Sequence, residues 1–327
     1  MNESNFFLTI DLGGSRLRAK AFSIDDANKS LEFELPGQNL RLVGDLELGK
    51  TFLAIRDRIE VEFGKNIFTW LIGAAGTKGL QDKRRISQLL GDLGINHTEL
   101  RVFPDAEAAW AAAFGGKPGI ITINGTGSVV FGRSGDAFYR KGGWGYLLDN
   151  SPSGSYFGRL AIKRLLQEWE EKPDEPILSR MYAEKFPNWP QDRAELVNLV
   201  YSTPNPQQFF GTFSPLFLNS VEKGCKWCSE MLFHSLETLF SQIVSLRKTC
   251  FNNTAAPLCG IGGLWENSAY FVEKTTHFFR NKDSQKIQIV KPAFSGVIGP
   301  LILYFLEKGK DISKIQPSLI LLEKSTK

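Results

Sequence analysis

The sequence predicts an α/β protein of two lobes that share one fold, and three observations carry this prediction. A stretch near the start, Thr-Ile-Asp-x-Gly-Gly-Ser at 9–15, is echoed by Thr-Ile-Asn-x-Thr-Gly-Ser at 122–128. Each copy lies between apolar, partly β-branched runs, which is the pattern of a strand, a glycine turn and a second strand. The 327 residues are enough for two domains, and the copies lie roughly a domain's length apart.

The first lobe is predicted to alternate strands and helices up to a glycine-rich break at 115–119. Its apolar periodicity predicts a hairpin over 6–22, strands at 31–35, 67–72 and 100–103, and helices at 48–63, 86–93 and 106–114. We therefore expect an N-terminal lobe of residues 1–116, on which a C-terminal helix of about 296–327 packs back. The apolar run 319–322 in that segment matches no predicted element.

The second lobe is predicted to cover residues 117–295 and to begin with the second hairpin. The rest of its pattern predicts helices at 160–170, within 177–222 and at 229–251, a short strand from 257 that runs into a glycine turn, and a strand at 287–290. Strands and helices alternate less regularly here, because most of the middle of this lobe is helical.

The two repeated turns are candidates for binding phosphate. Their glycines and hydroxyl residues are Gly13, Gly14, Ser15, Gly125, Thr126, Gly127 and Ser128. Glycines in such turns can take φ > 0 and point several backbone N–H groups inward beside the hydroxyls, as a phosphate requires. An ordinary β-hairpin turn is the alternative for either copy taken alone. Because the pattern occurs twice, we favour two turns that clamp one polyphosphate.

Two carboxylates are candidates for the chemistry. Asp11 is the one carboxylate in either turn, and Mg²⁺ held through water by Asp11 and by the phosphates themselves would fit. Asp105 lies at the first turn of the predicted helix 106–114, where the helix N-terminus would stabilise its ionised form, so an N-cap is the structural alternative. An ionised Asp105 could also accept a proton from a hydroxyl that attacks a γ-phosphate. Glu107 is the nearest rival for that role.

These motifs resemble, in order, those of the N-acetylglucosamine kinase and BadF/BadG/BcrA/BcrD-type ATPase family, within the actin-like ATPase and sugar kinase superfamily. The matching segments are 11–15 and 125–128 for the phosphates, 104–109 around Asp105, the glycine-tryptophan loop 142–145, and 262–263. Each motif alone is weak, but five in order along almost the whole chain are specific. The resemblance implies two ribonuclease H-like (actin-like ATPase) lobes with a nucleotide cleft between them, and ATP with Mg²⁺ as cofactors.

The resemblance also implies a role for each matching position. Asp105 would be the catalytic base. The residues expected beside the adenosine are Gly260, Gly262 and Gly263, and those expected beside the sugar are Asn39, Gly76, Thr126, Gly143, Trp144 and Asn150. Structural alternatives remain open for three of these positions: an Asx turn at Asn39, a core position for Trp144, and a tight strand–helix turn at Gly262.

The sequence departs from the family after the glycine-tryptophan loop. Where these kinases usually carry Gly-Asp-Glu-Gly-Ser-Gly, residues 149–154 read Asp-Asn-Ser-Pro-Ser-Gly. The family's sugar-binding acid therefore falls at Asn150, and its neighbouring glutamate falls at Ser151. An amide both accepts and donates, so the donor pattern of the pocket changes. This departure concerns the identity of the sugar rather than phosphoryl transfer.

Composition excludes several other classes of protein. The net charge is +4, and no basic run interleaved with aromatics points to nucleic acid. No secretory leader or membrane-length apolar run is evident, so a cytoplasmic location is expected. There is no GxxxxGK[ST] motif. Cys225 and Cys228 form a CxxC, which we interpret as ordinary helix residues because no second cysteine pair accompanies it.

The sequence thus predicts an ATP-dependent kinase that phosphorylates a hydroxyl of an amino sugar or related hexose, similar to an N-acetylglucosamine or glucosamine kinase. A small-molecule sugar is the expected partner, and the resemblance implies a homodimer. Two alternatives remain. One is a nucleotide- or sugar-binding sensor without catalysis, suggested by the departure at 150–152. The other is a dehydratase-activating ATPase, disfavoured because no cysteine precedes Cys225 to hold an iron–sulfur cluster.

Overall fold

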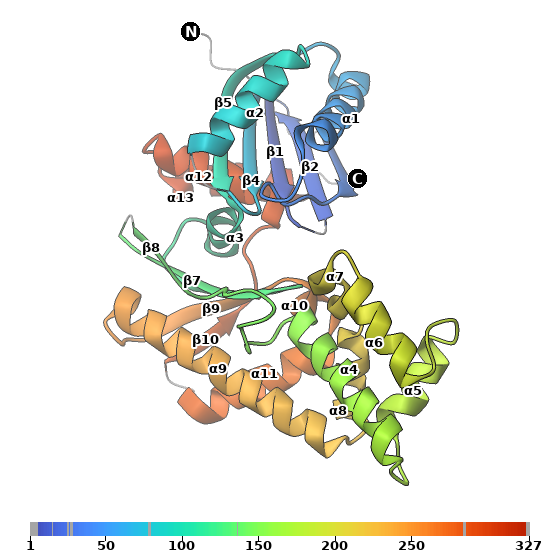
Figure 1. Cartoon of the computed structure of the whole chain (residues 1–327). Helices are drawn as coiled ribbons and strands as arrows, with labels where there is room; N and C mark the ends of the chain where they lie inside the picture. The colour runs from blue at the N-terminus through green and yellow to red at the C-terminus, as the bar shows by residue number, and fades with distance from the viewer. Residues whose placement is uncertain are drawn as a thin grey trace. The chain divides into compact units, whose positions relative to one another are not determined.

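The computed structural model describes residues 6–14, 16–24, 26, 29–77, 80–135, 137–283 and 286–324. The chain divides into two compact units (Figure 1). Unit 1 comprises Met1–Pro118 and Lys291–Lys327, and unit 2 comprises Gly119–Val290.

Unit 1 is built on a five-stranded sheet with the strand order β3-β2-β1-β4-β5. The strands are β1 (Phe6–Leu12), β2 (Arg16–Ser23), β3 (Ser30–Pro36), β4 (Phe68–Ala74) and β5 (His97–Pro104). Strand β2 runs antiparallel to its neighbours β1 and β3, whereas β4 runs parallel to β1 and β5 runs parallel to β4. The carboxyl ends of β1, β4 and β5 therefore meet at one edge of the sheet.

Helices α1 (Asp45–Phe63) and α2 (Leu80–Asp92) share a core with this sheet. The predicted helical period of α1 is confirmed, because its buried side chains recur along one face. They pack among strand residues such as Leu8, Ile10 and Leu12, which are fully buried. The alternate residue Phe7 contacts the rings of Tyr304 and Phe305 instead, so the odd-numbered side chains of β1 face the C-terminal segment.

That C-terminal segment forms the short turn η1 (Gly296–Ile298), α12 (Gly299–Glu307) and α13 (Ile312–Lys324). Helix α12 packs on α3 (Asp105–Phe114), and a Cβ at Gly299 would overlap the backbone of Ala108. Only glycine permits this close approach. The single helix expected over 296–327 is wrong in detail, since α12 ends near Gly309, whose φ is +66°.

Helix α13 contains the apolar run 319–322 that the sequence left unplaced. Leu319 and Leu322 are buried, and the carbonyl of Leu322 accepts a hydrogen bond from the Lys20 ammonium at 2.6 Å. Lys20 lies in β2, is 1% exposed, and also pairs with Glu32 at 3.2 Å. A buried lysine needs such partners, so the docking of α13 helps to satisfy this charge.

Unit 2 repeats the sheet of unit 1. Its strands are β6 (Ile120–Asn124), β7 (Ser128–Ser134), β8 (Ala137–Gly142), β9 (Ala256–Ile261) and β10 (Ile287–Val290), in the order β10-β9-β6-β7-β8. Strand β7 runs antiparallel to its neighbours β6 and β8, whereas β9 runs parallel to β6 and β10 runs parallel to β9. Because this is the topology of unit 1 strand for strand, the prediction of two lobes of one fold is confirmed.

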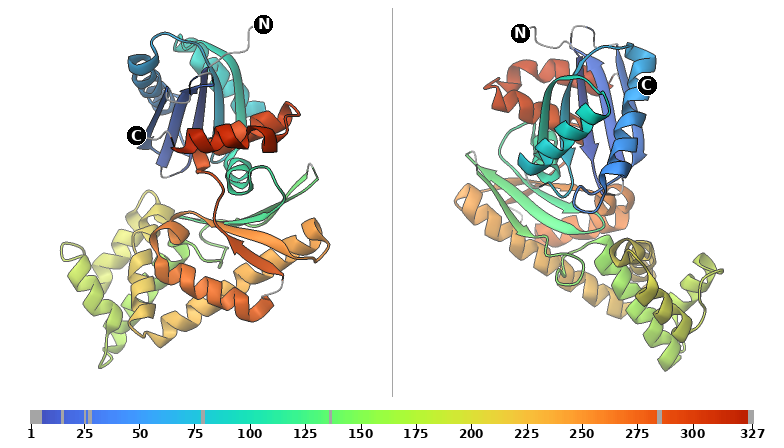
Figure 2. Two further views of the ribbon diagram at one scale, coloured as in Figure 1. Left: turned by 180° about the vertical axis from the view of Figure 1, so that it is seen from behind. Right: turned by 45° about the horizontal axis from the view of Figure 1, so that its top comes forward.

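Helices make up the rest of unit 2 (Figures 1 and 2). They are α4 (Gly154–Glu171), α5 (Ile177–Lys185), α6 (Arg193–Ser202), α7 (Pro206–Gly211), α8 (Ser214–Glu222), α9 (Lys226–Phe251), α10 (Gly263–Asn267) and α11 (Ala269–Asp283). Helix α9 packs against β7 and β8, and α4 packs against α7 and α8. Among the helices within the described residues, none is long and apolar enough to cross a membrane.

Candidate functional site

One edge of the unit 1 sheet collects four of the predicted residues. Asp11 pairs with Gly73 near the end of β4, and Ala74 pairs with Pro104 at the end of β5. Gly76 lies two residues after the end of β4, and Asp105 directly follows the end of β5. Asn39 joins them, because Leu40 N donates to Ala75 O at 3.0 Å. The structure thus brings Asp11, Asn39, Gly76 and Asp105 to the same edge, as in other sheets whose ligands bind beyond the strand ends.

The first turn does not use the backbone conformation that we expected. Neither Gly13 nor Gly14 has a positive φ, so the prediction of φ > 0 is wrong for both. Gly13 is required for a different reason: its N–H donates to Arg16 O at 3.0 Å, and a Cβ there would lie 2.9 Å from that oxygen. Ser15 lies outside the described residues.

Asp11 lies against the start of η1. A Cβ added to Gly296 would lie 2.8 Å from Asp11 Oδ2, so only glycine leaves room for this carboxylate. Sequence analysis missed Gly296 as a neighbour of Asp11, since 285 positions separate them. In the part of the chain that the structure describes, no cluster of three or more His, Cys, Asp or Glu side chains is arranged to hold a metal.

Asp105 is the first residue of α3 and not its N-cap. The N-cap is Pro104, and Asp105 Oδ1 accepts a hydrogen bond from Ala106 N at 2.9 Å. Burial raises the pKa of Asp105 above its usual value, and the Ala106 N–H only partly opposes this shift. We expected the helix N-terminus to favour the ionised form of Asp105, but desolvation by burial outweighs that effect on its pKa. A carboxyl with a raised pKa is a better proton acceptor when it is ionised.

Asn39 forms the Asx turn that was its structural alternative. Its Oδ1 accepts from Arg41 N at 2.9 Å, and Arg41 Nε donates to Gly76 O at 3.1 Å. Gly76 has a φ of +81°, and a Cβ there would overlap the Asn39 side chain. The Asx turn uses only the carbonyl of the Asn39 amide, so its NH₂ group could still donate to a ligand.

The second turn is organised by a buried asparagine that ends β6. Asn124 Nδ2 donates to Ser128 Oγ at 3.0 Å and to Pro152 O at 2.7 Å. Its Oδ1 accepts from Thr122 Oγ1 at 2.8 Å and from Trp265 Nε1 at 2.7 Å. Every polar atom of this amide is therefore paired, which rigidifies the turn beside it.

The glycines of this turn also lack positive φ, so that expectation is wrong here too. Gly125 N donates to Gly127 O at 3.0 Å and closes the turn. The N-terminus of α4 then supports it, since Gly154 N donates to Gly125 O at 2.7 Å and Ser155 N donates to Thr126 O at 3.1 Å. The turn is held from outside by hydrogen bonds rather than shaped by left-handed glycines.

The motif predicted for adenosine packs directly on this turn. Gly262 has a φ of +97°, and a Cβ there would lie 3.0 Å from the carbonyl of Asn124. Trp265 covers Gly260, where any side chain would overlap the indole, and Gly263 begins α10. The tight strand–helix turn proposed as the alternative is thus present, and it lies next to the candidate phosphate turn. A tight turn at Gly262 is compatible with a position beside bound adenosine.

The glycine-tryptophan loop follows β8. Trp144 is 66% exposed, so the alternative that it is a core residue is wrong. Gly143 packs on β7, because a Cβ there would lie 3.2 Å from Val129 Cγ2. Asn150 is exposed, whereas its neighbour Asp149 is buried and binds backbone N–H groups of the loop. Sequence analysis missed Asp149; its place among glycines and serines was the available signal.

The CxxC lies at the start of α9. Cys225 is the N-cap of α9 and Cys228 lies in its first turn, so only Cys228 is a helix residue in the strict sense. Both thiols are buried and free. The Cys228 thiol donates a hydrogen bond to the Cys225 sulfur and so lowers the pKa of Cys225 to about 6, although burial opposes this shift.

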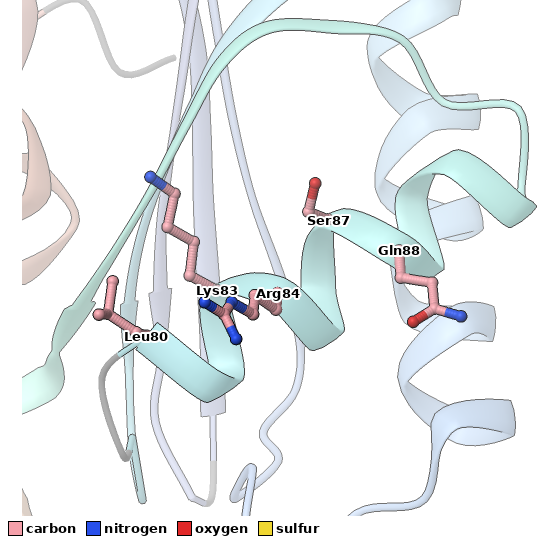
Figure 3. A pocket seen from close by; sticks show the side chains of 5 residues that line it. All are labelled: Leu80, Lys83, Arg84, Ser87 and Gln88. Carbon is pink, nitrogen blue, oxygen red and sulfur yellow. The ribbon is translucent and has the colours of Figure 1, made fainter.

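A hollow on α2 holds none of the predicted residues. It has a volume of about 480 Å³ and is lined by Leu80, Lys83, Arg84, Ser87 and Gln88, all from this one helix (Figure 3). Long side chains along a single helix readily enclose such a surface groove. It is not part of the candidate site.

The fold and the paired turns define a class of protein. The two units share one sheet topology, and the predicted actin-like ATPase fold of two such lobes is confirmed by its likeness to solved structures of sugar kinases. A candidate N-acetylglucosamine kinase from Chromobacterium violaceum superposes with a TM-score of 0.70 at 20% identity, over 92% of this chain and 99% of that one. No protein-family model matches the chain.

Two sequence relatives are both named as kinases of amino sugars. The chain is 25% identical over 234 residues to an N-acetylmuramic acid/N-acetylglucosamine kinase of Clostridium acetobutylicum, covering 71% of this chain and 75% of the relative. It is 26% identical over 263 residues to an N-acetyl-D-glucosamine kinase of Dictyostelium discoideum, covering 74% and 79%. The resemblance to the N-acetylglucosamine kinases that the motifs indicated is confirmed.

Proposed function

We propose that the protein is an ATP-dependent kinase that transfers the γ-phosphoryl group of ATP to a hydroxyl of an amino sugar. The observation that carries this proposal is the placement of Asp105, a partly buried carboxyl of raised pKa, at the same sheet edge as Asp11. The amino-sugar kinases named among the relatives support the class of substrate. A cytoplasmic location and a homodimer belong to the same proposal.

The reaction assigns one task to each group. The sugar hydroxyl oxygen attacks the γ-phosphorus, Asp105 takes the hydroxyl proton, and ADP leaves with the former bridging oxygen. Asn39 and Gly76 lie beside Asp105 at the sheet edge and would contact the sugar. In unit 2 the turn at 125–128 would hold phosphate oxygens, with the adenosine at 260–263. Trp144 and Asn150 complete the sugar side in this proposal.

Asp11 is the group that would hold Mg²⁺, through water. Its carboxylate lies near the end of β1 and is partly exposed, and the glycine at 296 keeps a side chain from crowding it. A bound Mg²⁺ neutralises charge on the phosphates during transfer. A single carboxylate suits this ion, which keeps several waters when it is bound with a nucleotide.

The test of the function is ATP-dependent release of ADP with glucosamine, N-acetylglucosamine, N-acetylmuramic acid, N-acetylmannosamine and glucose. We expect turnover with at least one N-acylated or free amino sugar and little with glucose. Binding of ATP without turnover on any of the sugars would contradict the kinase and favour a sensor. The Asp105→Asn variant controls for a contaminating kinase.

Turnover should depend on pH through Asp105. The base must be ionised, so kcat/KM falls as the pH falls through its pKa. Because burial raises this pKa, the fall should begin above the range of an ordinary aspartate. The measurement is kcat/KM against pH with coupling enzymes in excess and stability checked at each pH. A profile that stays flat down to the usual pKa of aspartate would contradict the assignment.

Asp11→Asn should raise the Mg²⁺ concentration that gives half-maximal activity by about tenfold or more, because a water-held hard cation loses its one protein charge. Activity is measured against free Mg²⁺ at a fixed concentration of ATP. Asp57→Asn is the matched control in the same unit, since the side chain of Asp57 is 63% exposed. An unchanged Mg²⁺ dependence in Asp11→Asn would remove this residue from the metal site.

A further inference from the structure

The carboxylate of Asp149 links the start of the loop between β8 and α4 to Ser151, further along the same loop. Its Oδ2 accepts from Gly143 N at 2.8 Å and from Trp144 N at 3.4 Å, while its Oδ1 accepts from Ser151 N at 2.9 Å. The residue is 6% exposed. A buried carboxylate that accepts several backbone N–H groups makes strong, charge-assisted hydrogen bonds.

The loop backbone is shaped around this carboxylate. Gly142 and Gly143 have φ values of +68° and +71°. A Cβ at Gly142 would lie 3.1 Å from Asp149 Oδ2 and 2.9 Å from Gln242 Oε1. Side chains are therefore excluded at the point where the chain turns toward Asp149, and the two glycines supply the conformation that the hydrogen bonds require.

The same loop is anchored to two helices. Gln242 Nε2 of α9 donates to Ser151 Oγ at 2.8 Å, and Arg159 of α4 donates to Leu147 O at 3.3 Å. The end of the loop is hydrogen-bonded to the phosphate turn independently of Asp149. Pro152 O accepts from Asn124 Nδ2, and Gly154 N donates to Gly125 O. The start of the loop, by contrast, depends on Asp149.

We propose that Asp149 is a positioning residue for the sugar side of the site, where it fixes the backbone from which Trp144 projects. This inference rests on the proposed function. The indole is 66% exposed, so the backbone at Gly143 and Trp144, rather than core packing, sets its position. Asp149 itself is buried and has both oxygens bonded, which leaves the exposed Asn150 to face a ligand.

Asp149→Asn removes one of the two sets of hydrogen bonds that the carboxylate makes, either the bond from Ser151 N or the bonds from Gly143 N and Trp144 N. An asparagine has one accepting oxygen, so it can bond Ser151 N or the Gly143 and Trp144 N–H groups, but not both. We expect the KM for the sugar to rise about tenfold or more, as the loss of one charge-assisted bond implies. The KM for ATP should stay within about twofold of the wild-type value, because the phosphate turn keeps its bonds to Pro152 and Gly154.

The experiment combines kinetics with amide hydrogen exchange of the full chain. Exchange in the segment 143–151 should become faster in Asp149→Asn, as its protecting acceptor is lost. Asp192→Asn is the matched control: Asp192 also accepts a backbone N–H, from Glu195 at 3.1 Å, but caps α6. Ser151→Ala is a milder second variant, which loosens the same loop and should raise the sugar KM less.

An unchanged sugar KM in Asp149→Asn would overturn the proposal, and so would an equal rise in Asp192→Asn or an equal rise in the KM for ATP. Wild-type protein that turns over no sugar would count against the proposed function instead. In that event the exchange comparison still decides whether Asp149 holds the loop, since unchanged exchange at 143–151 would exclude it.

Discussion

Asp105→Asn is expected to lower kcat by about 10²–10⁴-fold, the usual contribution of a positioned general base. An amide of the same shape cannot take the hydroxyl proton, yet it preserves the hydrogen bond from Ala106 N. Binding of sugar and nucleotide should therefore remain near the wild-type level. The measurement is single-turnover ADP formation, with calorimetry for the two ligands.

The same variant should not destabilise the protein at neutral pH. Because burial raises the pKa of Asp105, the folded protein favours the protonated carboxyl. The stability that this preference gives is present at low pH and is lost as the pH rises from the unfolded-state pKa through the folded-state pKa. Replacing Asp105 by a neutral amide removes the cost of the ionised form, so the Tm should be equal or higher. Active sites commonly sacrifice stability in this way.

Glu107→Gln provides the matched control, because Glu107 also lies in the first turn of α3. We expect it to retain most of the activity. If Glu107→Gln lost turnover and Asp105→Asn kept it, the assignment of the base would have to be exchanged between these two residues.

Much of the fold was predictable because it rests on local periodicity. The repeat of the turn at 9–15 and 122–128 predicted two lobes, and the strands of the two sheets match in order. Helix α13 was not predicted as a separate helix, since its apolar run is short and Pro317 lies just before that part of the chain. Its docking includes a hydrogen bond from the buried ammonium of Lys20, which lies 302 positions before Leu322 in the chain.

The site was predictable as a set of turns but not as a set of contacts. Glycine composition suggested left-handed turns at 13–14 and 125–127, yet the structure needs Gly13 for a close approach to Arg16 O. Asp149 and Gly296 matter through neighbours that are distant in sequence or that only the folded loop creates. Such tertiary constraints leave no periodic signal in a single sequence.

Gly262→Ala is the second change expected to have a large effect. Gly262 has φ +97° and ψ 176°, a region that is essentially restricted to glycine, so alanine should cost about 1–3 kcal/mol of stability. The new Cβ would also lie 3.0 Å from the carbonyl of Asn124 and 3.1 Å from Gly125 N. Neither backbone atom can move without displacing the candidate phosphate turn.

This contact should make the loss of nucleotide affinity larger than strain alone explains. We expect the Kd for ATP to rise about tenfold or more, equivalent to roughly 1.4 kcal/mol of displaced binding contacts. Gly64→Ala is the matched control, because Gly64 has φ 64° and ψ −156° at the end of α1, with nothing within 4 Å of the new Cβ. It should lose stability but keep its affinity for ATP. Equal affinities in the two variants would separate Gly262 from the nucleotide site and leave it as a purely structural turn.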